Sequence, residues 1–146
     1  MITSAHNSRI AQVRRLIEKR RERQESGLFV VEGLRLVEEA WRSGWEMEFV
    51  LYSQAISDRG LALKGEMVAR GLELEEVEAD LLNRLSDTET SQGLLAVVHF
   101  KELPLPDRLD FVMAVDGIRD PGNLGTLLRS AASAGVQAVL FAPGCA

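Results

Sequence analysis

The residues with the clearest potential for chemistry lie in one segment, residues 116–129. This segment reads Asp-Gly-Ile-Arg-Asp-Pro-Gly-Asn-Leu-Gly-Thr-Leu-Leu-Arg, and it follows the apolar run 111–115. A turn that enters a helix leaves several backbone N–H groups unpaired, and Gly122 and Gly125 would let a ligand approach the backbone closely. Asn123 is a favourable N-cap residue, so we expect the helix to begin there.

Arg129 is the basic side chain of the helix predicted after this turn. It projects about 140° away from Leu124 at 100° per residue, so it lies off the apolar face of the helix. A guanidinium in this place could stabilise negative charge that develops on a bound hydroxyl group. The spacing also allows a purely structural turn and a solvated arginine, since most arginines are exposed. It fits neither a Walker A loop nor a dinucleotide-binding Gly-x-Gly-x-x-Gly turn.

The order Asn123, Gly125, Arg129 after Asp-Pro-Gly resembles the first motif of the SpoU (TrmH-type) RNA ribose 2′-O-methyltransferases, which have knotted catalytic domains. In that family the asparagine and the arginine line the methyl-transfer site. The resemblance therefore implies catalytic roles for Asn123 and Arg129 and S-adenosylmethionine as the cofactor. We expect Arg129 to act electrostatically, because a neutral guanidine is hard to reach in a protein.

Three upstream segments extend the resemblance over nearly the whole chain. They are Asn-Ser-Arg at 7–9, Phe-Val-Val-Glu-Gly at 29–33 and Ser-Gln-Gly-Leu-Leu-Ala-Val-Val at 91–98. They look like the N-terminal substrate-binding domain of the same family, which is similar in fold to small ribosomal RNA-binding proteins. The resemblance implies that this part of the chain docks ribosomal or transfer RNA.

Helical and strand patterns alternate along the chain, which predicts an α/β fold. The apolar spacing predicts helices over 7–24, 34–42, 61–69 and 79–85, with strands over 28–31, 48–52, 72–77 and 94–98. A polar loop is expected over 86–92.

Two prolines within residues 101–107 predict a stiff, extended connection between two parts of the chain. We expect a three-layer RNA-binding domain over 1–102, a linker over 103–109, and the β-α-β start of a knotted methyltransferase domain over 110–146. The expected elements of this last part are a strand at 111–115, a helix at 123–135 and a strand at 136–141.

Charge is unevenly distributed in this acidic chain, whose formal net charge is −5. Residues 9–23 hold seven basic and two acidic side chains. Arg15, Lys19 and Arg23 are spaced at i, i+4 and i+8, so a continuous helix would place them on one face. A solvated face remains an alternative, but with the family resemblance we predict that Arg9, Arg15, Lys19 and Arg23 contact RNA phosphates.

Other features narrow the class of protein. One cysteine and two separated histidines predict no metal site. No apolar run reaches the length of a membrane span, and the first residues lack the pattern of a signal peptide. We therefore expect a cytoplasmic protein that does not enter a membrane.

The family resemblance also implies features beyond the first motif. In the family, the later part of the catalytic domain supplies the cofactor pocket, the knot and the dimer interface, and residues 130–146 hold none of its further motifs. We therefore expect a homodimer in the complete protein and no methyl transfer by the 146-residue chain alone. Two alternatives stay open: a non-catalytic RNA-binding module, and a nucleotide-binding α/β domain that uses the turn at 122–125 as a phosphate cradle.

Overall fold

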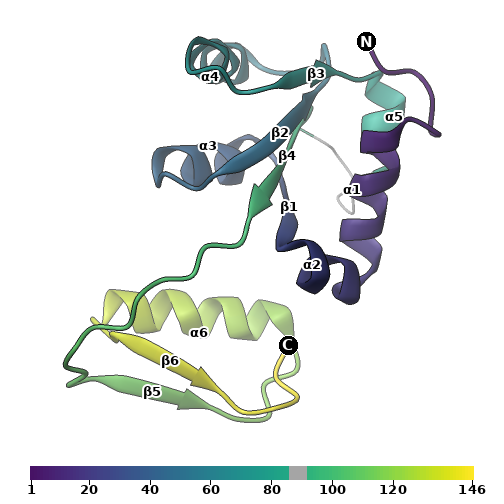
Figure 1. The fold of residues 1–146 in the computed structure, drawn as a ribbon. Helices are drawn as coiled ribbons and strands as arrows, with labels where there is room; N and C mark the ends of the chain where they lie inside the picture. The colour runs from purple at the N-terminus through teal and green to yellow at the C-terminus, as the bar shows by residue number, and fades with distance from the viewer. Residues whose placement is uncertain (86–91) are drawn as a thin grey trace. The chain divides into compact units, whose positions relative to one another are not determined.

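The computed structural model of the chain describes residues 1–85 and 92–146. Two compact units make up the fold, Met1–Lys101 and Glu102–Ala146. Both units combine helices and strands (Figure 1), so the α/β fold predicted from the alternating patterns is confirmed. We describe each unit separately.

The first unit is built on a four-stranded sheet with the order β1-β4-β2-β3. Its strands are β1 (Leu28–Glu32), β2 (Met47–Tyr52), β3 (Leu74–Glu76) and β4 (Leu94–His99). β4 pairs antiparallel with β1 and with β2, whereas β2 and β3 run parallel. β4 lies in the interior of the sheet and is covered by helices on both faces. This explains why its residues 94–98 are all apolar, since a strand buried on both faces does not alternate with polar residues.

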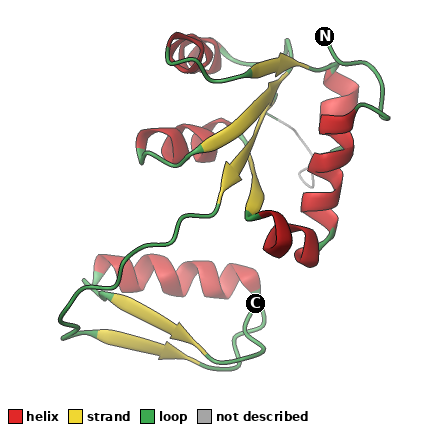
Figure 2. Ribbon diagram, viewed as in Figure 1, coloured by secondary structure: helices red, strands yellow, loops and turns green. Residues whose placement is uncertain are grey.

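Helices cover both faces of this sheet (Figures 1 and 2). On one side lie α1 (Ser8–Glu18) and α5 (Ala79–Asn83), and α2 (Arg20–Ser26) follows α1. On the other side lie α3 (Leu34–Arg42) and α4 (Asp58–Ala69). The result is a helix–sheet–helix arrangement with one apolar core on each side of the sheet.

The alternation of β4 divides its side chains between these two cores. Leu95 and Val97 pack in the first core, to which α1 contributes Ile10, Val13 and Leu16. Leu94, Ala96 and Val98 pack in the second core, to which α3 and α4 contribute Val37, Leu63 and Met67. Each core thus joins the sheet to the helices on its side, and this packing holds the helix ends that carry the polar side chains discussed below.

A β-bulge in β2 changes which face its side chains occupy. The register to β4 shifts between Met47 and Phe49. Met47 therefore packs in the second core and Phe49 in the first, although strict alternation would place them on the same face. The intervening Glu48 is exposed, and its Oε2 lies 2.8 Å from Nε2 of His99.

The predicted helix over 7–24 is wrong, because two helices meet there at Lys19. Lys19 has an extended backbone (φ −118°, ψ 109°) and serves as the C-cap of α1 and the N-cap of α2. Nη1 of Arg23 donates to the carbonyls of Leu16 and Ile17, at 2.7 and 3.0 Å. These carbonyls belong to the last turn of α1, where intrahelical donors are missing, so Arg23 satisfies them from outside the helix.

Smaller differences concern element ends. α4 begins at Asp58, three residues before the predicted start, because the Ser57 side chain accepts from the N–H of Gly60 and caps the helix. β3 occupies only Leu74–Glu76 of the predicted strand 72–77. Most of the polar loop predicted over 86–92, and Ser91 of the third upstream segment, lie outside the described residues.

The second unit is a single β-α-β motif. Its elements are β5 (Val112–Val115), α6 (Pro121–Ser133) and β6 (Ala138–Phe141), and the two strands pair in parallel. α6 buries Leu124 and Ala131, and β5 buries Val115. Val112 and Leu140 stay exposed, since a single helix covers only one face of the two strands.

Candidate functional site

The turn between β5 and α6 is organised by Asp120. Oδ1 of Asp120 accepts a hydrogen bond of 2.7 Å from the backbone N–H of Asn123. Asp120 is thus the N-cap and Pro121 occupies the first helical position, so the prediction that Asn123 caps the helix is wrong. The Asp-Pro pair could have revealed this, because aspartate caps well and proline lacks only an N–H that would be unpaired there anyway. The Asn123 side chain is left exposed on the first turn of α6.

Arg129 folds back along α6 toward this turn. Its Nη2 donates to the hydroxyl of Thr126 at 3.0 Å, and Thr126 in turn donates to the carbonyl of Gly122. A Cβ added at Gly125 would lie 3.4 Å from Nη1 of Arg129, so the glycine lets the guanidinium lie close to the helix. Asn123 is exposed on the first turn of α6, and Arg129 is exposed in its C-terminal half, about 1.7 turns further along.

The basic residues predicted to contact RNA have several intramolecular partners. The guanidinium of Arg9 binds the carboxylates of Glu73 and Glu75, at 2.6 and 2.5 Å, and its Cζ lies 4.4 Å from the centre of the Phe49 ring. Only 23% of the Arg9 side chain is exposed. This geometry ties the start of α1 to the segment around β3, which is a structural contact.

Arg15, Lys19 and Arg23 do not form the continuous face that a single helix would give. Nε of Arg15 binds Glu22 at 3.1 Å, and Arg23 holds the end of α1 as described above. Lys19 is exposed at the break between the two helices, and among the described residues its side chain has no partner. Two of these three cations thus already have partners in the protein.

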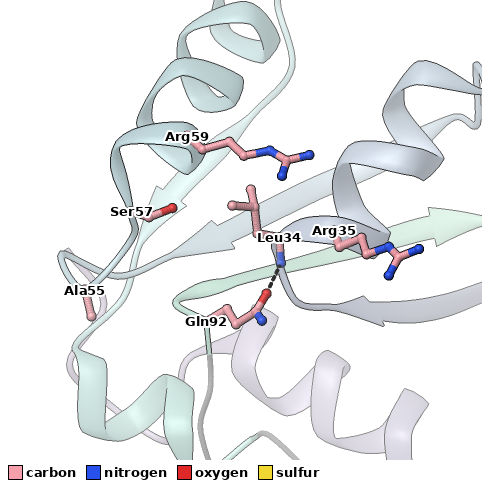
Figure 3. A pocket seen from close by; sticks show the side chains of 6 residues that line it. All are labelled: Leu34, Arg35, Ala55, Ser57, Arg59 and Gln92. Atoms are coloured by element: carbon pink, nitrogen blue, oxygen red, sulfur yellow. Dashed lines mark hydrogen bonds between the residues drawn. The ribbon is translucent and has the colours of Figure 1, made fainter.

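A second basic surface, absent from the sequence predictions, lies between α3 and α4. A cavity of about 420 Å³ is lined by Leu34, Arg35, Ala55, Ser57, Arg59 and Gln92 (Figure 3). Oε1 of Gln92 accepts from the N–H of Leu34 at 2.9 Å and so satisfies a donor at the start of α3. Gly33, with φ +89°, leaves the space for this amide, since a Cβ there would lie 3.3 Å from Oε1 of Gln92.

A neighbouring hollow of about 490 Å³ shares Arg35 and Arg59 with this cavity and extends to Arg42. Glu38 also lines this hollow, and its side chain is only 11% exposed. Oε1 of Glu38 accepts from Nε and Nη2 of Arg42, at 3.0 and 2.8 Å, and its Oε2 accepts from Nη2 of Arg59. Burial alone would raise the pKa of Glu38, but the hydrogen bonds and charges of the two arginines hold it below its ordinary value. The carboxylate is therefore ionised at neutral pH.

Neither a metal centre nor a membrane span appears in the described ranges 1–85 and 92–146. No three His, Cys, Asp or Glu side chains gather there as metal ligands do. None of the helices in these ranges combines the length and apolar character needed to cross a bilayer.

Comparison with known proteins assigns the first unit to a family. Residues 7–96 match the family described as the MRM3-like substrate binding domain. This chain belongs to that family. The resemblance to the SpoU (TrmH-type) 2′-O-methyltransferases inferred from the motifs is confirmed, because named relatives and solved structures are enzymes of this type.

Two curated relatives illustrate the relationship of this MRM3-like chain to methyltransferases. One is the Bacillus subtilis 23S rRNA (guanosine(2553)-2'-O)-methyltransferase RlmP, 33% identical over 146 residues, with 99% of this chain and 55% of the relative covered. The other is the mitochondrial rRNA methyltransferase 3 of Mus musculus, 31% identical over 145 residues, with coverage of 94% and 34%. The chain therefore spans about half, or less, of the length of these relatives.

Solved structures of methyltransferases resemble the chain as well. An rRNA methyltransferase from Sinorhizobium meliloti matches with a TM-score of 0.80 and 28% identity, covering 99% of this chain and 55% of that one. The SpoU methyltransferase AviRb from Streptomyces viridochromogenes, in complex with AdoMet, matches with a TM-score of 0.77 and 28% identity. That match covers 96% of this chain and 53% of AviRb.

Sequence reasoning missed Arg35, Arg42, Arg59 and Glu38 as a group. One signal was available locally, because Glu38 and Arg42 stand at i and i+4 with the glutamate first, the favourable order for a helix pair. Arg59 lies 21 residues beyond Glu38 on a different helix. Its part in the group followed only from the packing of α4 beside α3.

Proposed function

We propose that the protein is an S-adenosylmethionine-dependent RNA methyltransferase that modifies a ribose 2′-hydroxyl of ribosomal RNA. In this proposal the first unit docks the RNA, and the β5–α6 turn supplies Asn123 and Arg129 to the methyl-transfer site. Transfer RNA remains a second possible substrate of the same chemistry.

One observation carries the catalytic part of the proposal. The Arg129 guanidinium is folded back toward the start of α6, where its Nη2 donates a hydrogen bond to Thr126. A guanidinium has five N–H donors, so most of them are left for a substrate. A ribose hydroxyl must lose its proton to attack a methyl sulfonium, and a fixed positive charge beside the oxygen lowers the cost of that charge development. The Asn123 amide on the first turn could hold the ribose or a phosphate.

A relative named for its RNA substrate and a solved structure with bound AdoMet support the proposed substrate class, ribosomal RNA, and the proposed cofactor. RlmP of Bacillus subtilis is named as a 2′-O-methyltransferase of 23S rRNA, and AviRb was solved with AdoMet. We infer the same cofactor here, a homodimer for the complete protein and a cytoplasmic location. The resident cofactor would supply the methyl group, and the residues of this chain would position and polarise the acceptor hydroxyl.

The test is methyl transfer from labelled S-adenosylmethionine to ribosomal RNA by the full-length protein. Removing a donor that stabilises a developing oxyanion lowers kcat by about 10²–10³-fold, and we expect Arg129→Ala to show a loss of this size. Arg119→Ala is the matched control, because Arg119 is an exposed arginine of the same turn with no side-chain partner among the described residues. Equal activity of the two variants would contradict the role of Arg129.

The 146-residue polypeptide by itself is a separate case. We propose that it binds RNA but transfers no methyl groups, since the methyltransferase relatives are about two to three times as long. Turnover by the purified 146-residue chain would refute this part of the proposal. The contacts predicted for Arg9, Arg15, Lys19 and Arg23 with RNA stay a prediction, and of these only Lys19 has no side-chain partner among the described residues.

A further inference from the structure

The arginine groove, defined here by Arg35, Arg42 and Arg59, combines positive charge with free donors. Arg42 and Arg59 are bound to Glu38, yet their side chains are 63% and 68% exposed. Each guanidinium has five N–H donors. Two nitrogens of Arg42 and one nitrogen of Arg59 donate to the Glu38 carboxylate. Arg35 has no side-chain partner among the described residues. Most of the donors of the groove therefore face solvent.

Glu38 keeps two of these arginines in place without neutralising the groove. A buried carboxylate that accepts from two guanidinium groups limits the rotamers of both, so part of the entropy of ordering them is already lost before a ligand binds. The six residues that line the first cavity include Arg35 and Arg59 and no acidic side chain. That cavity is therefore positive overall, and Ser57 and Gln92 add neutral polar groups to its wall (Figure 3). The second hollow is also lined by Glu38 and Glu39, so over both hollows three arginines face two carboxylates and one net positive charge is left.

The chemistry of the groove favours phosphate over other ligands. A planar guanidinium matches two phosphate oxygens, and several guanidinium groups along a groove match a chain of phosphates. Neither hollow is lined by an aromatic ring on which a base could stack. Contacts of this kind position a nucleic acid and read its backbone, whereas the bases stay unread.

We propose that the arginine groove between α3 and α4 docks the phosphate backbone of the RNA substrate. The proposal rests on the proposed function, which names RNA as the substrate of this unit. It moves the main RNA contact away from α1 and α2. Arg59, like Arg9, is paired with a glutamate, but its side chain is 68% exposed, against 23% for Arg9. Arg35 and Arg59, shared by both hollows, are the principal phosphate ligands.

The test is binding of a labelled, structured ribosomal RNA fragment to the 146-residue chain across a salt series. Each lost phosphate contact reduces the slope of log K against log salt by about 0.9. We expect Arg35→Ala/Arg59→Ala to lower the slope by about 2 and the affinity at least about tenfold. The control is Arg14→Ala/Arg20→Ala, which removes two exposed cations from α1 and α2 that are not among the predicted RNA contacts and should change both quantities little.

The outcomes separate this inference from the proposed function. RNA affinity of the groove variant equal to that of the wild-type chain would overturn the groove alone. Loss of affinity only in the Arg14/Arg20 variant would do the same. No binding by the wild-type chain at low salt would overturn the groove together with RNA docking by this unit. Displacement of the RNA by poly-glutamate of equal charge would point to an acidic protein partner and would also overturn the assignment to RNA. Unchanged tryptophan fluorescence of each variant checks that the first unit is folded.

Discussion

Replacing Arg9 by alanine separates a structural contact from an RNA contact. In the structure Arg9 joins the first turn of α1 to Glu73 and Glu75 and covers the ring of Phe49. Arg9→Ala removes both ion pairs and the cation–π contact at once. We expect a clear loss of stability of the first unit, because among the described residues Arg9 makes the ion pairs that join α1 to the β3 segment.

The size of the loss follows from the surroundings of each contact. Exposed ion pairs contribute about 0–1 kcal/mol each, and pairs with partly buried members contribute more. Glu73 is exposed, whereas Arg9 and Glu75 are partly buried. The contact with Phe49 adds about 0.5–2 kcal/mol. Against this, Nη1 of Arg9 is buried without a partner among the described residues, which already costs the native protein about 1 kcal/mol or more. The balance is a loss of about 2 kcal/mol.

Thermal unfolding followed by tryptophan fluorescence measures this loss in the right part of the chain. Both tryptophans, Trp41 and Trp45, lie in the first unit, so the signal reports that unit. For a unit of this size, 1 kcal/mol corresponds to about 4–8 °C in Tm, which predicts a decrease of about 8–16 °C. Arg20→Ala is the control, because Arg20 is exposed on α2 without a side-chain partner in the described ranges, and its Tm should stay within a few degrees.

Two results would refute the reasoning about Arg9. A Tm of Arg9→Ala equal to that of Arg20→Ala would mean that the ion pairs and the ring contact contribute nothing to folding. A stable variant that lost RNA affinity would make Arg9 a direct RNA ligand, as the sequence predicts. A double-mutant cycle with Glu75→Ala should give a coupling energy of at least about 0.5 kcal/mol if the pair matters.

Three further predictions concern other parts of the chain. Asp120→Ala removes the N-cap of α6 and should cost the second unit about 1 kcal/mol, seen as faster amide exchange in α6. Gly93→Ala, at φ +72° with a Cβ 2.9 Å from Oγ of Ser53, should lower the urea midpoint more than Gly44→Ala, which has a similar φ and open space. Glu38→Gln should destabilise the first unit at pH 7, and the difference from wild type should shrink below about pH 4, because a lowered pKa stabilises only while the carboxylate is ionised.

Each of these predictions has a contradicting outcome. Unchanged exchange in α6 would show that the Asp120 carboxylate is not a cap. Equal midpoints for the two glycine variants would mean that the space around Gly93 can adjust without cost. A stability difference for Glu38→Gln that does not depend on pH would mean that charge plays no part in the contact with Arg42 and Arg59.

Local sequence patterns were enough to predict several helices and strands, the family motif and one helix cap. Apolar spacing predicted α3 at its observed bounds and the strand β4 as a buried central strand, because side-chain periodicity reflects which faces a segment buries. The motif that ends at Arg129 indicated the family through residue types and their spacing alone. The cap at Asp120 could also have been read from the Asp-Pro pair, since capping depends on neighbouring residues only.

Only the tertiary structure decided the roles of the charged residues. Arg9 meets Glu73 and Glu75 across more than 60 residues of chain, and Arg59 meets Glu38 only because α4 packs beside α3. No glycine or proline at Lys19 indicates in the sequence that the helix breaks there. The carbonyls left unpaired at the end of α1 accept hydrogen bonds from Arg23, which lies on the next helix. Local spacing carries no information about which distant segment will lie opposite a side chain. Whether an arginine is a structural ligand or is free for RNA is therefore settled by packing between elements, which the sequence specifies only through the whole fold.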